Sequence, residues 1–121
     1  MTFSGEEMGL LGSNYFFKNP TIDIKKISYM INMDMVGSMK KDSSLSVYDT
    51  GTSPIFKQVL KSHNDNFKLV QRASGVGLSD HTSFYLANIP VLHFFMGQHE
   101  NYHKPEDDSE KIKLYGYAFN F

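Results

Sequence analysis

The residues of this chain that could do chemistry are carboxylates and histidines in a few short segments. Glu6 and Glu7 stand side by side in FSGEEMGLLGS, Asp34 lies in NMDMVG, and His103 lies in YHKPEDD. The chain has no cysteine, so a metal would be held by His, Asp and Glu. A zinc site of this kind keeps an open position for water, and a neighbouring free carboxylate takes the proton of that water. Adjacent glutamates at a sharp turn could divide this work, one as ligand and one as base.

The elements that must position these side chains are strands alternating with helices. The apolar runs predict a strand end at residues 2–4 and strands over 27–36, 45–48, 67–71 and 91–96. Helices are predicted over residues 9–18 and 82–87, after Ser53-Pro54, and from Lys111 onward. This alternation predicts an α/β fold, a mostly parallel sheet flanked by helices. Ligands of such sheets bind beyond the carboxyl ends of the strands, so we expect the acids and histidines to meet at one edge.

Length and composition favour one globular domain and exclude some partners. The chain has 121 residues, 40% of them apolar and 14% aromatic. The net charge of −1 gives no electrostatic reason to expect a nucleic acid or an anionic membrane as partner. No apolar run approaches the roughly 20 residues of a membrane span, and no signal peptide is recognisable. The compartment is not set by these observations.

Four motifs together carry a family resemblance. FSGEEMGLLGS, NMDMVG, SDHTSF and YHKPEDD, in this order, resemble the zinc-dependent aminopeptidase family with two co-catalytic metals. That family includes secreted bacterial leucine-type aminopeptidases, and glutaminyl cyclases are relatives of the same fold. The resemblance runs from about residue 3 to about residue 112. It implies the carboxy-terminal part of a three-layer α/β catalytic domain, two zinc ions per complete site, a peptide substrate with a free amino terminus, and a secreted or periplasmic location.

The resemblance also implies roles for individual residues. Glu6 resembles the general base that activates water, and Glu7 resembles a ligand of one zinc. His103 resembles a second ligand of that zinc, and Asp34 resembles a ligand of the other zinc that also holds the substrate's amino group. Tyr102 resembles the phenol that stabilises the tetrahedral oxyanion in some members.

A further group matches the Ser-Asp-His signature of the family. These residues, Ser79, Asp80 and His81, are expected to line the pocket or to support the ligands from behind.

One part of the family's pattern is missing. Members also carry a His-x-Asp motif upstream of the paired glutamates, whereas the His-x-Asp at residues 63–65 lies downstream, at the end of an amphipathic helix, and is interpreted as surface. Three protein ligands are too few for two tightly bound dications. We therefore expect a single truncated catalytic domain over residues 1–121 that is inactive alone, although its parent is an enzyme.

Other interpretations stay open at this point. A glutaminyl-cyclase-like transferase would use a single zinc, and a non-catalytic truncated module would only fold or associate. Strands missing from the sheet would leave an exposed edge, which could make a homo-oligomer.

Simpler structural roles are also open for several residues. Paired glutamates at a helix start can simply favour the helix dipole, and Asp34 and His103 could have only local roles. Simple packing or capping is the better interpretation for a second set: His93, His99, Phe94 to Met96, Asp107 and Asp108.

Overall fold

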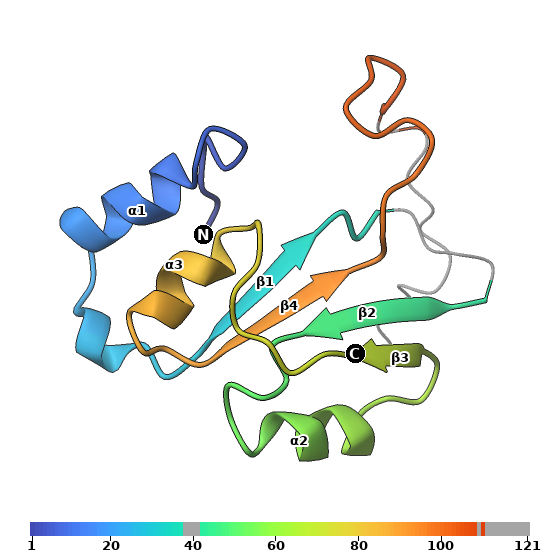
Figure 1. Ribbon diagram of the computed structural model, residues 1–121, viewed down its shortest axis with the longest axis horizontal. Helices are drawn as coiled ribbons and strands as arrows, with labels where there is room; N and C mark the ends of the chain where they lie inside the picture. The colour runs from blue at the N-terminus through green and yellow to red at the C-terminus, as the bar shows by residue number, and fades with distance from the viewer. Residues whose placement is uncertain (38–41, 109, 111–121) are drawn as a thin grey trace.

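The computed structural model describes residues 1–37, 42–108 and 110 of the chain (Figure 1). The helix predicted from Lys111 onward lies outside the described residues. The helices are α1 (Leu11–Lys18), a 3-10 turn η1 (Ile24–Lys26), α2 (Phe56–Ser62) and α3 (His81–Leu86), and the strands are β1 (Met30–Asp34), β2 (Ser44–Tyr48), β3 (Lys68–Gln71) and β4 (Val91–Phe95). No helix in this part of the chain has the length and apolar character that crossing a membrane requires.

The four strands form one mixed sheet in the order β1-β4-β2-β3. Strand β1 pairs with β4 in parallel, and β2 pairs with β3 in parallel. The predicted α/β architecture is confirmed: among the described residues, two of the three strand pairings are parallel, and only β2 and β4, at the centre, run antiparallel to each other. The carboxyl end of β2 therefore reaches the middle of β4, where Tyr48 lies opposite His93. This arrangement brings β2 into the same region as the ends of β1 and β4.

Helices cover both faces of the sheet and make three layers (Figure 1). Neighbouring residues of a strand point to opposite faces. On β4, Val91 packs in a cluster with Phe16 of α1 and Phe84 of α3, whereas Leu92 packs in a second cluster with Phe56 of α2. The alternation along this central strand thus gives α1 and α3 one face and α2 the other.

The first predicted strands differ most from the structure. Residues 2–4 form no strand; instead the ring of Phe3 packs against Phe16 and Phe84. The strand expected over residues 27–36 is shorter and less buried than predicted, since β1 is an edge strand. Within the described residues it pairs with β4 alone, and Ile31 and Met33 are exposed. Apolar character alone does not distinguish an edge strand from a central one.

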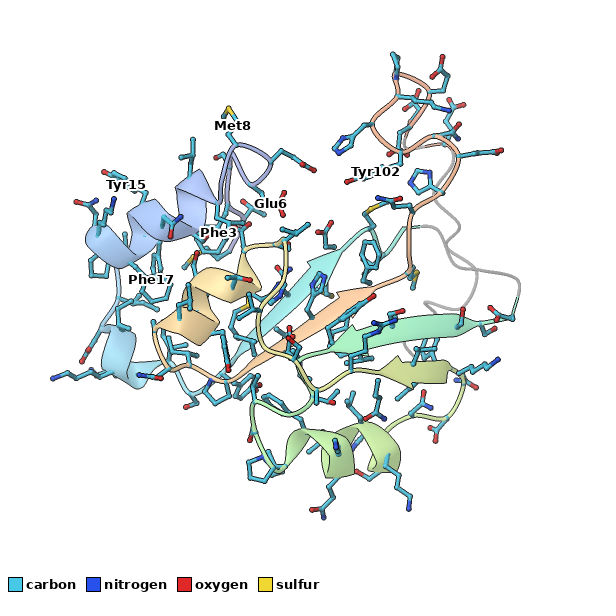
Figure 2. All side chains as sticks on the ribbon, viewed as in Figure 1. Phe3, Glu6, Met8, Tyr15, Phe17 and Tyr102 are labelled. Atoms are coloured by element: carbon cyan, nitrogen blue, oxygen red, sulfur yellow. The ribbon has the colours of Figure 1, made fainter. Side chains whose placement is uncertain are left out.

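A tight turn holds the paired glutamates just before α1. Backbone N–H groups of Gly9 and Leu10 both donate to the carbonyl of Glu6, and Gly5 sits at a φ of +68°, which favours glycine. Gly12 brings α1 against the segment before the turn, because a Cβ there would lie 2.7 Å from Ser4 backbone atoms. Figure 2 shows Phe3 and Phe17 on the inner side of this unit and Met8 and Tyr15 on its outer side.

Candidate active site

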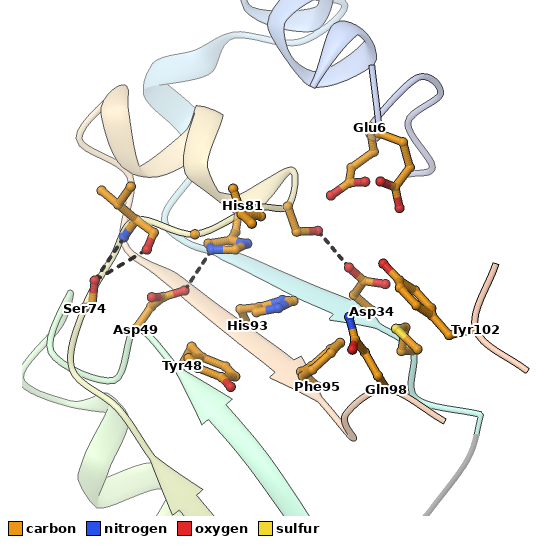
Figure 3. Close-up of a pocket in the computed structure, with 16 residues that line it drawn as sticks. Glu6, Asp34, Tyr48, Asp49, Ser74, His81, His93, Phe95, Gln98 and Tyr102 are labelled. Carbon is orange, nitrogen blue, oxygen red and sulfur yellow. Dashed lines mark hydrogen bonds and ion pairs between the residues drawn. The ribbon is translucent and has the colours of Figure 1, made fainter. Parts of the chain in front are cut away.

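A cavity of about 420 Å³ opens beside the carboxyl ends of β1 and β4. It lies among the N-terminal turn, α3, the end of β2 and the loop that follows β4 (Figure 3). Its lining holds most of the residues that the sequence singled out: Glu6, Glu7, Asp34, Ser79, His81 and Tyr102. Four separate pieces of chain therefore bring acids, a histidine and a phenol to one edge of the sheet, as the order of the elements predicts.

The acidic end of the cavity centres on Glu6 and Asp34. Partial burial and then the neighbouring charges of Glu7 and Asp34 raise the pKa of the Glu6 carboxyl above its ordinary value. Ser79 Oγ donates a hydrogen bond of 3.1 Å to Asp34 Oδ2, and the same hydroxyl lies close enough to Glu6 to offset part of that rise in pKa. A carboxylate with a raised pKa is a better proton acceptor, which suits Glu6 to general base catalysis.

Tyr102 faces the same acids from the loop after β4 (Figure 3). Partial burial and the charges of Glu7, Asp34 and Glu6 raise the pKa of its phenol, whereas a hydrogen bond with Gln98 works against the rise. The phenol therefore stays protonated at neutral pH and can donate a hydrogen bond. A donor of this kind is what an oxyanion developing in the cavity would need.

Glu7 and His103 make direct contact across the mouth of the cavity. His103 Nε2 lies 3.1 Å from Glu7 Oε1, with both side chains more than half exposed. His103 has a φ of 56°, a left-handed conformation that histidine, like asparagine and aspartate, adopts more often than most residues do. Within residues 1–37, 42–108 and 110, no three His, Asp or Glu side chains gather closely enough to hold a metal ion. The pair thus supplies two convergent donors, and Asp34 stands apart from them.

The deep end of the cavity is built from two histidines and a buried aspartate (Figure 3). His81 stacks on His93 with centroids 4.4 Å apart, and His81 Nε2 lies 3.3 Å from Asp49 Oδ2. Burial lowers the pKa of His81 to about 4, and the charge of His93 adds to this shift. Burial raises the pKa of Asp49 to about 6. With these pKa values His81 is neutral wherever Asp49 is charged, so their contact is not an ion pair.

Two of the predicted site residues, Asp80 and His103, do not line the cavity. Asp80 does not line the cavity; it is buried beside it, and its Oδ1 atom has no hydrogen-bond partner among the described residues. His103 also lies outside the lining and reaches the site through Glu7. The individual roles of the predicted site residues stay predictions, whereas their gathering in one place is an observation.

The simpler interpretations hold for some residues and not for others. No acidic residue lies in the first turn of α1, so the helix dipole does not account for Glu6 and Glu7. His93 is buried and hydrogen-bonded to Asn32, as expected of a core histidine, but it also lines the cavity. His99 contacts Asp107 at 3.6 Å, away from the cavity lining.

Sequence reasoning missed several polar residues around the cavity. Tyr48 and Asp49 line it, and Asn32 hydrogen-bonds to two residues that do. Asp49 sits in DTGTSP, which resembles an ordinary turn, and Asn32 lies in a run of apolar residues. A usable signal was the spacing in NMD, because residues two apart on a strand share a face, so that Asn32 points the same way as Asp34.

A comparison with known protein families identifies the family of this chain. The family model described as Peptidase family M28 matches residues 1–118. The chain is a member of Peptidase family M28. The M28 assignment agrees with the resemblance carried by the four motifs, and with the position of those motifs around one cavity.

Several relatives of this M28 chain are named aminopeptidases. Leupeptin-inactivating enzyme 1 of Streptomyces exfoliatus is 36% identical over 98 residues, which are 78% of this chain and 22% of that protein. Among solved structures, an aminopeptidase from Aneurinibacillus sp. strain AM-1 superposes with a TM-score of 0.66 at 32% identity, covering 93% of this chain and 28% of the other. A zinc aminopeptidase from Bacillus subtilis gives a TM-score of 0.67 at 28% identity, covering 93% and 30%. The chain thus spans roughly a quarter of the length of these relatives.

Proposed function

We propose that this site serves the metal-dependent hydrolysis of a peptide bond next to a free amino terminus. Membership of Peptidase family M28 and the aminopeptidases among its relatives support this proposal. The observation that carries it is the cavity in which Glu6, Asp34 and Tyr102 meet, with the Glu7–His103 pair at its mouth. Because the solved relatives are named aminopeptidases, hydrolysis is favoured over the cyclisation that a glutaminyl cyclase would perform.

The Glu7–His103 pair fits a zinc ion. Two ligands of one tetrahedral zinc, each roughly 2.0–2.1 Å from the metal, lie about 3.3 Å from each other. Glu7 Oε1 and His103 Nε2 are 3.1 Å apart, and both are donors that zinc accepts. We assign these two residues to one zinc and Asp34 to the other. Since the described residues bring only two donors together, we expect this chain alone to bind zinc weakly and to turn over slowly.

The side chains of the cavity divide the chemistry among them. Zinc, when bound, polarises a carbonyl and lowers the pKa of water. Glu6 takes the proton of the attacking water and passes it to the leaving amine, a role that its raised pKa supports. The protonated phenol of Tyr102 donates to the developing oxyanion. The negative charges of Glu6, Glu7 and Asp34 attract the positively charged amino terminus of a peptide into the cavity.

The deciding test is zinc titration by calorimetry on the purified chain. His103→Ala and Glu7→Gln should each weaken binding about tenfold or more, because each removes one of two convergent donors. His63→Ala is the matched control, since His63 is an exposed histidine on another part of the surface. Equal binding by His103→Ala and His63→Ala would contradict the assignment of the metal site.

A second assay addresses the reaction itself. Zinc-loaded chain is incubated with leucine p-nitroanilide and with the same compound carrying an acetylated amino group. Release of nitroaniline from the free amine alone supports an aminopeptidase. Cleavage of both compounds contradicts the requirement for a free amino terminus, and zinc binding without any cleavage agrees with the expected inactivity of this chain alone as well as with the non-catalytic module.

A further inference from the structure

Asn32 lies behind the cavity, in the middle of β1 and directly opposite His93 of β4. Its side-chain nitrogen Nδ2 contacts two groups that line the cavity: Ser79 Oγ at 2.9 Å and His93 Nδ1 at 3.0 Å. Asn32 itself is not part of the lining. It therefore influences the site only through the residues that it holds.

The chemistry of the amide fixes the direction of each hydrogen bond. An amide nitrogen carries two hydrogens and cannot accept, so both of its partners must accept. Ser79 has a single hydroxyl hydrogen, and because its oxygen accepts from Asn32, that hydrogen points to the acidic end of the cavity, where it donates to Asp34 Oδ2, 3.1 Å away, with Glu6 as the competing acceptor. His93 must accept through Nδ1, which places its hydrogen on Nε2.

The hydrogen bonds of Ser79 and His93 depend on which way the Asn32 amide faces. If the amide were turned over, its oxygen would face Ser79 and would draw the hydroxyl hydrogen away from Asp34. A turned amide would also place its oxygen before His93 Nδ1, and His93 would then have to carry its hydrogen on Nδ1, so the tautomer of His93 reports the orientation of the amide. In the observed orientation of its amide, Asn32 therefore donates to both His93 and Ser79, and Ser79 donates to Asp34; this sequence of hydrogen bonds is the donor order of the site.

We propose that Asn32 is a positioning residue of this site: it occupies the Ser79 oxygen as a donor, so that the Ser79 hydroxyl hydrogen is directed to one oxygen of the Asp34 carboxylate and the other oxygen is left for a cation. This inference rests on the proposed function, in which Asp34 is a metal ligand. Residues that hold metal ligands by hydrogen bonds change metal affinity by roughly 10–100-fold when they are removed. Asn32 acts one residue further from the ligand, through Ser79, so its effect depends on the Ser79 hydroxyl.

The first test reads the donor order in the metal-free chain. Nitrogen NMR of the imidazoles distinguishes the two neutral forms of His93, with its signals assigned by comparison with His93→Gln. The wild type should carry the hydrogen on Nε2. Asn32→Asp has the same shape but offers only an acceptor, so it should move the hydrogen to Nδ1. A wild-type His93 with its hydrogen on Nδ1 would overturn the inference without any metal being present.

The second test measures how substitutions of Asn32 change the affinity for a cation, with Co²⁺ as the probe. Asn32→Asp and Asn32→Leu should weaken Co²⁺ binding about tenfold, whereas Asn66→Asp, which adds the same charge at an exposed site, should not weaken it. Tighter binding by Asn32→Asp would show that charge, and not donor order, sets affinity, and would overturn the inference. Thermal unfolding of each metal-free variant identifies any that fail to fold.

A double-mutant cycle separates positioning from general stability. If Asn32 acts through Ser79, then Asn32→Leu should add no further loss of Co²⁺ affinity in a Ser79→Ala chain. Additive losses would assign Asn32 an independent structural role and would contradict the inference. If the wild type binds no Co²⁺ at all, the proposed metal function fails, and the position of the His93 hydrogen still decides whether Asn32 sets the donor order.

Discussion

The ring of His81 lies flat on the ring of His93, with an angle of 13° between their planes, and faces the buried carboxylate of Asp49 at its Nε2 edge. Three titratable side chains thus share the deep end of the cavity. Burial lowers the pKa values of His81 and His93 and raises that of Asp49. The histidines and the aspartate therefore give opposite contributions to stability as the pH changes.

We expect single substitutions of His81 and of Asp49 to separate their opposing contributions to the unfolding free energy. The lowered pKa of His81, about 4 against an ordinary 6.5, gives stability that is present above pH 6.5 and is lost as the pH falls towards 4. The raised pKa of Asp49, about 6, gives stability that is present at low pH and is lost as the pH rises through 6. Asp49→Asn should therefore show a steeper rise of unfolding free energy between pH 4 and 6.5 than the wild type, and His81→Gln a shallower one.

Urea unfolding at several pH values measures these slopes, and each group can contribute at most about 1.4 kcal/mol per pH unit. His63→Gln, at an exposed histidine, is the matched control for replacing an imidazole by an amide. Parallel curves for all four proteins would mean that neither buried group titrates differently in the folded chain.

Glu6→Gln should make the metal-free chain more stable at neutral pH while reducing catalysis. The raised pKa of Glu6 means that its contribution to stability is present below its unfolded pKa and is lost as the pH rises through the folded value. Removing the charge should therefore raise the melting temperature at pH 7 and leave it unchanged near pH 3. Any aminopeptidase turnover should fall by roughly 10²–10⁴-fold, the usual contribution of a general base. Glu100→Gln, in the loop after β4, is the control; a lower melting temperature for Glu6→Gln would contradict the unfavourable burial and repulsion of the Glu6 charge.

The sequence predicted the elements better than their pairing. Apolar runs bounded by Gly, Pro and Asn locate the strands and helices because these signals are local. The antiparallel pairing of β2 with β4 joins segments far apart in the chain, and nothing within either segment specifies it. The same limit applies to the site. Glu6 and Asp34 stand in recognisable motifs, whereas Asn32 and Asp49 have a role only through contacts that the fold creates.

Gly12→Ala should destabilise the chain although alanine favours helices. Alanine is worth up to about 1 kcal/mol over glycine in a helix interior. At this position, however, its Cβ would lie 2.7 Å from both Ser4 N and Ser4 O, and backbone atoms cannot move aside without shifting the turn that carries Glu6 and Glu7. Overpacking of this kind costs about 1–3 kcal/mol. Thermal unfolding measures the loss, with Tyr15→Ala on the exposed side of the same helix as control; a stabilised Gly12→Ala chain would show that the turn adapts freely.

Self-association through β1 is the last expectation, and it follows from the position of this strand in the sheet. In the part of the chain that the structure describes, strand β1 is at one edge of the sheet, and Tyr29, Ile31 and Met33 are exposed at or beside it. An edge with free backbone groups and apolar side chains invites pairing with another strand. We therefore expect light scattering to give a mass that rises with concentration beyond the 13.8 kDa of one chain.

Charged substitutions identify the edge that is responsible. Met33→Lys should bring the mass back towards that of a single chain, because a charge on an edge strand opposes pairing. Val70→Lys places the same charge on β3, the opposite edge of the sheet, and should leave the association unchanged. A monomeric wild type at every concentration would contradict the association itself. Equal effects of the two substitutions would contradict its assignment to β1, since a contact along one edge cannot respond equally to charges on both.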